Sequence, residues 1–505
     1  MSDGLPPYPP IDPTTFDLIV IGTGLPESLI AAAASAAGKT VVHLDPNPFY
    51  GSHFSSLSLP ELTSFLNTHS TPPPNPAPPF PSLAARPLYS DVEISDFAPE
   101  LLRSHSREFN LDLSGPRALF CADKSIDLLL KSGASQYLEF KSVEASFVGD
   151  GDGNLWSVPD SRAAIFKDKS LSLREKNQLM RFFKLVQRHL SYKEKKDNGG
   201  GGEEEEEEEE EDENARVSEE DLEMPFFEFL TKMRLPDKIK SIILYAIAMA
   251  DYDQENTEVC KDLLRTREGI DRLALYQSSM GRFKNAAGAL IYPIYGQGEL
   301  PQAFCRRAAV KGCIYVLRMP VISLLTDESN GSYKGVRLAS GQDIFSPKLV
   351  VDPSFVVLSV ETSPLDPMHE QFRCLTVRDV KGKVARGICI TRRSLKPDVS
   401  NVLVIYPPRS LYPEQMTSVR ALQISSKLAV CPEGMFVLYL STVCDNIDQG
   451  KRSLKAAINA LVTLPDSESP ENSSKIQSGI GEEAEPTLLW SGLYIQELTM
   501  ASLSS

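Results

Sequence analysis

The sequence predicts an α/β protein in which a Rossmann-type domain is interrupted by an all-helical insertion. An apolar strand at residues 18–21 leads through Gly22-Thr-Gly24 into an Ala-rich helix, and a second apolar strand follows at residues 40–44. Helical periodicity then dominates residues 159–280, and short strands alternate with short helices from residue 290 onward. Strand–helix alternation on both sides of a helical stretch predicts one α/β domain that is discontinuous in sequence.

The strand–turn–helix–strand segment has the order of a dinucleotide-binding unit, with Gly22 and Gly24 in the turn. Asp45 ends the second strand, about 20 residues downstream, where an acid binds a ribose hydroxyl. Glu27 replaces the third glycine of G-x-G-x-x-G, and its carboxylate would repel a pyrophosphate at the helix N-terminus. We therefore predict a flavoprotein-like fold without its flavin. The alternative is that Glu27 is only a favourable first-turn acid and that a dinucleotide still binds.

The negative charge of the chain is concentrated in one run. The 505 residues carry a net charge of −16, and residues 203–213 contribute eleven acidic side chains and no basic ones. Removing these eleven charges from −16 leaves −5, so the overall acidity says little about partners. Lys and Arg form no stripe and zinc-finger spacing is absent, which argues against a nucleic-acid partner.

The sequence offers no catalytic or metal-binding motif. It contains no G-x-S-x-G, no H-E-x-x-H and no C-x-x-C among its eight cysteines, so we expect no metal site and reduced thiols. His43 alternates within a strand and is interpreted as structural. The N-terminus lacks the features of a signal peptide and no apolar run is long enough to span a membrane, so a cytosolic location is expected.

The domain limits follow from where the periodicity changes. Residues 1–157 and 285–505 are assigned to the discontinuous α/β domain, and residues 158–284 to the helical domain. An acidic insertion at about residues 192–221 is expected to be disordered because like charges repel and bury no apolar surface. One helix carries an apolar stripe, for which a core-facing surface is the simplest interpretation; its members are Leu179, Phe182, Phe183, Val186 and Leu190.

Three segments carry a family resemblance over roughly residues 15–360. The first is residues 17–52, with Gly22-Thr-Gly-Leu-Pro-Glu-Ser and Leu44-Asp-Pro-Asn-Pro-Phe-Tyr-Gly51. The second is residues 128–141, followed by Val158-Pro-Asp-Ser-Arg-Ala-Ala. The third and most specific is Met280-Gly-Arg-Phe with Tyr292-Pro-Ile-Tyr-Gly-Gln-Gly-Glu-Leu-Pro-Gln-Ala-Phe-Cys305 and Gly312-Cys-Ile-Tyr-Val-Leu. Together they resemble the Rab escort protein / Rab GDP-dissociation inhibitor family.

Within that family the chain is similar to the escort branch, of plant type. Gln297, Cys305 and Ala246-Ile-Ala-Met249 resemble escort sequences, and inhibitors are shorter and lack acidic insertions. The resemblance implies a flavoprotein-like domain I, which binds GDP-loaded Rab GTPases, and a helical domain II. The Rab-binding residues that it implies are Tyr50, Gly51, Tyr245, Met249, Asp251 and Tyr252. Asp251 departs from the inhibitors, which carry a Rab-contacting arginine there.

The resemblance also assigns roles to domain II. There, family members hold the prenyl group and escorts dock the Rab geranylgeranyl transferase heterodimer. Tyr276 matches the transferase-contacting position, and Leu179, Phe183 and Val186 are candidate residues for an apolar prenyl channel. The chain ends at Met500-Ala-Ser-Leu-Ser-Ser, earlier than escorts do, so a final segment that helps to hold the Rab tail is expected to be missing or replaced.

The implied function is that of a non-catalytic, cytosolic substrate-binding component. It would bind GDP-bound, unprenylated Rab, present the Rab tail to the transferase, and retain the geranylgeranylated product for delivery to membranes. Two alternatives stay open. A GDP-dissociation inhibitor would only recycle prenylated Rabs, and a flavin-dependent oxidoreductase would contain bound flavin, which Glu27 disfavours.

Overall fold

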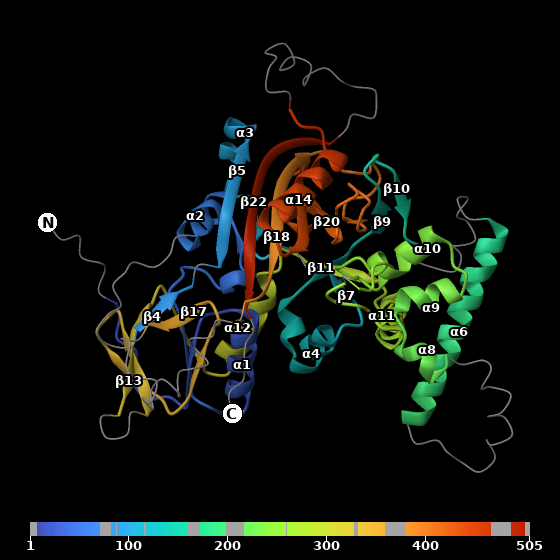
Figure 1. Ribbon diagram of the computed structural model, residues 1–505. Coiled ribbons are helices and arrows are strands. Elements are labelled where there is room, and N and C mark those ends of the chain that lie inside the picture. The colour runs from blue at the N-terminus through green and yellow to red at the C-terminus, as the bar shows by residue number, and fades with distance from the viewer. Residues whose placement is uncertain are drawn as a thin grey trace.

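A computed structural model describes residues 8–70, 82–86, 88–115, 118–159, 172–197, 217–258, 260–327, 332–358, 380–465 and 486–499. In Figure 1 the sheets form the main body and a group of helices lies at one side. Most of the predicted acidic insertion and the last residues of the chain lie outside the described ranges.

A four-stranded parallel sheet contains the predicted dinucleotide motif. Its strands, in spatial order, are β12 (Ile314–Leu317), β2 (Val41–Asp45), β1 (Leu18–Ile21) and β16 (Leu349–Val351). Leu18 and Val20 pack with helices α1 (Leu25–Ala36) and α12 (Glu299–Val310). Ile19 and Ile21 point to the opposite face because side chains alternate along a strand. There they meet an antiparallel sheet of β13 (Val321–Thr326), β14 (Tyr333–Leu338) and β15 (Asp343–Phe345).

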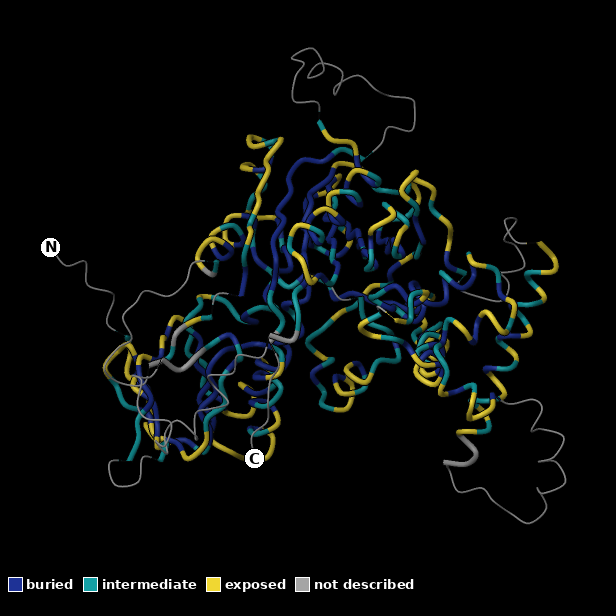
Figure 2. The backbone as a smooth tube through the Cα atoms, in the orientation of Figure 1, coloured by how far each residue is buried: buried dark blue, intermediate teal, exposed yellow. Residues whose placement is uncertain are grey.

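A larger mixed sheet forms the centre of the molecule. Its eight strands, in spatial order, are β10 (Leu155–Ser157), β9 (Ala145–Gly149), β19 (Val402–Tyr406), β20 (Val419–Ser425), β21 (Met435–Cys444), β18 (Val380–Arg392), β22 (Thr487–Thr499) and β5 (Tyr89–Asp96). Helix α14 (Ile447–Leu461) covers one face. The other face joins a core that extends into the helical group, so buried backbone continues between the two regions in Figure 2.

The smaller elements connect these layers. They are the pairs β3 (Ser56–Leu57) with β6 (Leu111–Asp112) and β17 (Phe355–Leu358) with β4 (Ser82–Ala85), the sheet β7 (Leu119–Phe120), β11 (Leu290–Pro293) and β8 (Phe140–Ser142), the helices α2 (Leu59–His69), α3 (Pro99–His105) and α4 (Lys124–Ser132), and the 3₁₀ turns η1 (Ser52–Phe54), η2 (Ala134–Tyr137) and η6 (Ser426–Leu428). The short strands expected after residue 290 include β16 and β19, at Leu349–Val351 and Val402–Tyr406.

The helical group lies within the range predicted for the insertion. It consists of α6 (Leu173–Asp197), α8 (Glu219–Glu223), α9 (Phe226–Lys232), α10 (Asp237–Ser241), the π-helix η4 (Ile242–Ile247) and α11 (Thr266–Ser279). The described ends of the predicted disordered insertion, residues 192–197 and 219–221, are helical, which corrects its limits.

The helical periodicity between residues 224 and 250 does not correspond to one continuous helix. Arg234 has a left-handed φ of 58°, and Pro236 follows at the cap of α10. Proline cannot donate the backbone hydrogen bond that would continue the helix, so the chain breaks and restarts. The last helix of the group, α11, begins at Thr266.

Candidate functional site: a closed nucleotide motif beside a cavity

The turn between β1 and α1 has the backbone geometry of a nucleotide-binding turn. Gly22 has a φ of 88°, which favours glycine, and its N–H donates to Leu44 O at 2.8 Å. His43 lies beneath it, with Nε2 2.5 Å from Gly22 O. Burial lowers the pKa of His43 to about 4, so the ring is neutral at pH 7 and donates to this carbonyl. The structural interpretation of His43 is therefore supported by its contacts.

Carboxyl groups fill the space in front of this turn. A methyl group added to Gly24 would lie 2.5 Å from Glu27 Oε2 and 2.8 Å from Asp352 Oδ2, and one added to Gly22 would lie 2.4 Å from Asp352 Cβ. Burial, and then the nearby Asp352 carboxylate, raise the pKa of Glu27 to about 8. A pyrophosphate needs the glycine backbone to be open for close approach. The residues present therefore do not fit the diphosphate of a flavin or nicotinamide dinucleotide.

The Asp45 carboxylate accepts hydrogen bonds from groups within the protein. Its Oδ2 accepts hydrogen bonds from Thr23 N (2.8 Å), Thr23 Oγ1 (2.6 Å) and Ser52 Oγ (3.3 Å), and its Oδ1 accepts from Asn47 N at 2.8 Å. The side chain is fully buried, and burial raises its pKa while the Thr23 hydrogen bonds lower it. Asp45 thus ties the turn to the loop after β2, where a nucleotide-binding relative would offer this acid to a ribose.

The first predicted Rab-binding pair lies in that loop. Tyr50 is half-buried and its ring meets Tyr315 edge-on, with centroids 5.8 Å apart. Gly51 is buried, has a φ of 105°, and donates its N–H to Thr23 Oγ1 at 2.9 Å. Gly51 therefore fixes the conformation of the loop. Of the two residues, only Tyr50 has a partly exposed side chain that a partner could contact.

The second predicted segment starts inside the core. Tyr245 is only 4% exposed, lies on the π-helix, and accepts a hydrogen bond from Gln254 N at 3.1 Å. The Tyr245 side chain therefore packs in the core of the free protein, and its role as a Rab contact stays a prediction. Met249, with a left-handed φ of 53°, ends the helical path and is partly exposed. Asp251 and Tyr252 are partly exposed as well, so these three residues stay candidates.

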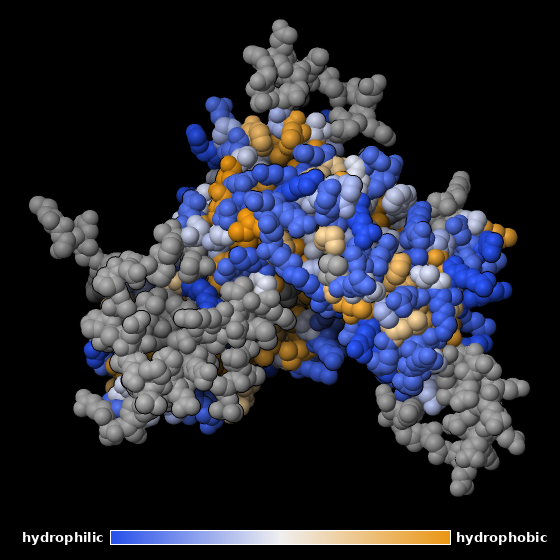
Figure 3. All heavy atoms as spheres, in the orientation of Figure 1, coloured by the Kyte–Doolittle hydropathy of each residue, from blue (hydrophilic) through white to orange (hydrophobic). Residues whose placement is uncertain are grey.

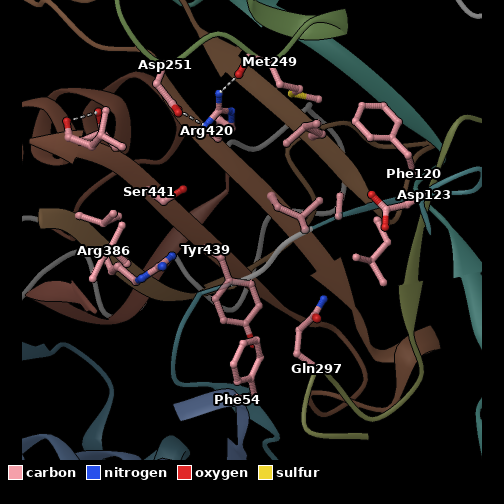
Figure 4. A pocket seen from close by; sticks show the side chains of 18 of the residues that line it. Phe54, Phe120, Asp123, Met249, Asp251, Gln297, Arg386, Arg420, Tyr439 and Ser441 are labelled. Atoms are coloured by element: carbon pink, nitrogen blue, oxygen red, sulfur yellow. Dashed lines mark hydrogen bonds and ion pairs between the residues drawn. The ribbon is translucent and has the colours of Figure 1, made fainter. Parts of the chain in front are cut away.

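Met249 and Asp251 lie at the edge of a cavity of about 620 Å³. Figure 4 shows Asp251 and Met249 at one end and Phe54, four residues after Tyr50, at the other. The lining is mainly apolar on strands β18–β21, and Arg386, Arg420, Gln297 and Asp123 add polar groups. The cavity thus lies between the two segments that the family resemblance singled out. Tyr252 lines a separate, smaller cavity of about 120 Å³.

Asp112 connects the third sequence motif to this region. Its carboxylate accepts hydrogen bonds from the Tyr292 hydroxyl, from Ser56 Oγ at 2.6 Å and from Gln297 N at 2.9 Å. Its backbone N–H donates to the Tyr439 hydroxyl at 2.9 Å. Burial raises the pKa of Asp112 to about 6, although the Ser56 and Tyr292 hydrogen bonds act to lower it. Gly296 of the motif leaves room for this buried carboxylate, since an added methyl group there would lie 2.6 Å from Asp112 Oδ1.

The predicted prenyl-lining residues lie in the packed helical core. Leu179 and Val186 are 3% and 2% exposed, and Phe183 packs partly buried against the same cluster. These three side chains pack in the core, as the core-facing interpretation expects, and their role in holding a prenyl group stays a prediction. Hydrophilic side chains predominate over the helical group in the view of Figure 3. Tyr276, the predicted transferase contact, is half-buried and packs edge-on against Phe120.

The sequence interpretation missed Asp352, Arg420 and Asp112. Asp352 directly follows strand β16, which is parallel to β1. An acid after an apolar run of this kind was therefore a usable sequence signal, because ligands bind at the carboxyl ends of parallel strands. Arg420 and Asp112 had no such signal, because their partners are 169 and 180 residues away in sequence.

Two further expectations concern what the described residues contain. Within them, no group of three or more His, Cys, Asp or Glu side chains is placed to hold a metal ion. The seven cysteines in these ranges are free thiols, and Cys374 lies outside them. A membrane-crossing helix, judged by length and apolarity, was not found in the described part of the chain.

The parallel sheet, its glycine turn with Glu27 and Asp352 in front of it, and the helical insertion define a Rossmann-type fold. The model of the GDP dissociation inhibitor family matches residues 12–77 and 80–470. The chain is 60% identical to Rab escort protein 1 of Arabidopsis thaliana, over 98% of this chain and 88% of that protein. It is 30% identical to the Rab proteins geranylgeranyltransferase component A of Drosophila melanogaster, over 85% of this chain and 74% of that protein.

A solved structure supports the fold independently. The Rab GDI of Plasmodium falciparum superposes with a TM-score of 0.61 at 19% identity, covering 95% of this chain and 90% of that one. The predicted α/β fold class with a helical insertion is confirmed. The protein belongs to the GDP dissociation inhibitor family, and its sequence places it with the Rab escort proteins of that family.

Proposed function

We propose that the protein is a Rab escort protein. It binds GDP-bound, unprenylated Rab GTPases, presents them to the Rab geranylgeranyl transferase heterodimer, and delivers the geranylgeranylated product to membranes. The observation that carries this proposal is the 60% identity to Rab escort protein 1 across 98% of the chain. The component A relative, which is named for the geranylgeranyltransferase, supports the same role.

The protein acts in this scheme by binding and works in the cytosol, without catalytic chemistry of its own. When the protein holds the folded part of a Rab, the effective concentration of the flexible Rab tail at the transferase rises. Prenyl transfer is then faster although this protein supplies no catalytic residue. A preference for GDP-Rab must, by linkage, slow the release of GDP. The position of Tyr50 on the loop tied by Asp45 and Thr23 supports its use as a contact residue.

We also propose that no flavin is bound. The Glu27 and Asp352 carboxyl groups occupy the approach to Gly22 and Gly24, and Asp45 accepts hydrogen bonds from within the protein. Protein purified after expression in flavin-supplemented medium is expected to release no flavin on denaturation, as measured by fluorescence of the supernatant. Release of one flavin per chain would overturn this proposal and revive an oxidoreductase role.

The direct test is transfer of radiolabelled geranylgeranyl groups onto a purified GDP-loaded Rab by the transferase, with and without this protein. Transfer that depends on the added protein supports the escort role. If the protein binds prenylated GDP-Rab tightly but does not stimulate transfer, it is a recycling inhibitor instead, as the name of the family model allows.

Replacement of Tyr50 with alanine is expected to weaken binding of unprenylated GDP-Rab by about tenfold, equivalent to about 1.4 kcal/mol, as for an aromatic interface anchor. Calorimetric titration measures the affinity. The matched control is Tyr192→Ala, which also removes a half-buried tyrosine but lies on α6 in the helical group. Equal losses in the two variants would show that Tyr50 acts through general stability and not through contact.

A further inference from the structure

The segment from Ala248 to Asp251 is held by an unusual set of donors. A helix leaves its last carbonyl groups without partners inside the helix. Here the π-helix η4 ends and four successive carbonyl groups each find an external donor. Arg272 Nη1 donates to Ala248 O at 2.8 Å, and Ser418 N donates to Asp251 O at 2.7 Å. The two carbonyl groups between them belong to Met249 and Ala250.

Arg420 on strand β20 supplies the central contacts. Its Nη2 donates to Met249 O at 2.7 Å and to Ala250 O at 3.3 Å, and its Nη1 forms an ion pair with Asp251 Oδ1 at 2.5 Å. One planar guanidinium therefore bridges three consecutive residues, a geometry that lysine cannot reproduce. Figure 4 shows this guanidinium between Met249 and Asp251 at the end of the cavity.

The residues that follow are added to the sheet. Asp253 N donates to Met416 O at 3.0 Å, and Tyr252 pairs with Thr417 in an antiparallel bridge. Ser418 Oγ donates to Ala250 O at 2.9 Å, and Arg409 forms an ion pair with Asp253. The chain from Met249 to Asp253 is thus fixed from one side by residues 409–420, and Arg420 makes the most contacts at the point where the backbone enters its left-handed turn.

We propose that Arg420 is the positioning residue of the Rab-binding segment 249–253. The inference rests on the proposed function, because it takes this segment to be a contact surface. It also gives Asp251 a role different from that of the inhibitor arginine at this position: Asp251 points inward to Arg420 and anchors the segment. Rab affinity therefore depends on a sheet residue whose side chain is 25% exposed and which lies behind the contact surface.

The experiment compares Arg420→Met, Arg420→Lys and Asp251→Asn in the full-length protein. Affinity for unprenylated GDP-Rab is measured by calorimetry, and hydrogen exchange of residues 249–253 is measured in the free protein. Arg420→Met is expected to weaken binding about tenfold and to speed exchange in this segment. Arg420→Lys is expected to be intermediate, and Asp251→Asn to lose only about two- to threefold, because the carbonyl contacts remain. Arg337→Met, which breaks the Arg337–Asp343 pair on β14 and β15, is the control.

The outcomes separate the positioning role from the proposed function. Faster exchange with weaker binding in Arg420→Met, but not in Arg337→Met, supports the inference. Unchanged exchange in Arg420→Met overturns it whatever the binding result. Faster exchange with undiminished affinity also overturns it, and leaves the escort role standing. If the parent protein binds no GDP-Rab, the proposed function fails and this positioning role fails with it, although exchange still reports whether Arg420 anchors the segment.

Discussion

Replacement of Gly296 with alanine is expected to cause the largest loss of stability of any single change considered for this protein. Gly296 has a φ of 100°, and an added methyl group would lie 2.4 Å from Ser56 Oγ and 2.6 Å from Asp112 Oδ1. The left-handed backbone costs about 1–3 kcal/mol for a side-chain-bearing residue, and overpacking a filled site costs about as much again. Because Asp112 is buried and bonded to Ser56 and Tyr292, neither neighbour moves without losing a hydrogen bond.

The measurement is the midpoint of thermal unfolding, which is expected to fall by several degrees or more. Gly312→Ala is the matched control, since Gly312 has a similar φ of 93° but no heavy atom within 4 Å of the added methyl group. Gly312→Ala should lower the unfolding midpoint only by the cost of placing a side chain on a left-handed backbone. A fall as large in Gly312→Ala as in Gly296→Ala would contradict the steric argument around Asp112.

Replacement of Glu27 with glutamine is expected to stabilise the protein in a pH-dependent way. The folded protein holds the Glu27 proton up to a pKa of about 8, whereas the ordinary value is 4.5. Stability contributed by this raised pKa is fully present below pH 4.5 and is lost as the pH rises toward 8. The slope is about 1.4 kcal/mol per pH unit in that window, so the total reaches several kcal/mol. Glutamine keeps the shape of the side chain without the titrating proton.

The prediction is read from the difference in unfolding midpoint between Glu27→Gln and the parent protein. That difference should be small at pH 5 and should grow to several degrees in favour of the variant at pH 8. The control is Glu220→Gln, which removes an exposed acid from the first turn of α8. It measures how much stability changes when a negative charge near a helix N-terminus is lost without any change in burial. A difference for Glu27→Gln that stays constant between pH 5 and pH 8 would show that its carboxyl group does not titrate as inferred.

The fold could be predicted to a large extent because its signals are local. The Gly22-x-Gly24 turn, the apolar strands and the alternation after residue 290 each depend on residues close in sequence, and the fold class followed from their order. The helical segment was less predictable in detail. Hydrophobic periodicity continues through Arg234 and Pro236, but the backbone there does not, because proline ends the hydrogen-bond pattern.

The site was predictable only where a motif pointed to it. Glu27 and Asp45 were found from the spacing of a known turn. The structure adds Asp352, which follows a strand that pairs with β1 but lies far from it in sequence. The family resemblance located the 245–252 segment but could not separate buried Tyr245 from exposed neighbours, because a π-helix changes which residues face outward. Arg420 was out of reach, since its ion pair with Asp251 depends on tertiary structure.

The order of strands in the large sheet has a consequence for synthesis of the protein. In the described part of the chain, β5 pairs only with β22, whose residues follow it by nearly 400 positions. At ribosomal rates of about 5–20 residues per second, β5 waits roughly 20–80 s for its partner strand. During that time Tyr89, which is buried against Tyr494 in the folded protein, lacks this packing partner. The nascent chain therefore exposes an unpaired strand, and its yield in cells should depend on chaperones that shield such edges until β22 is made.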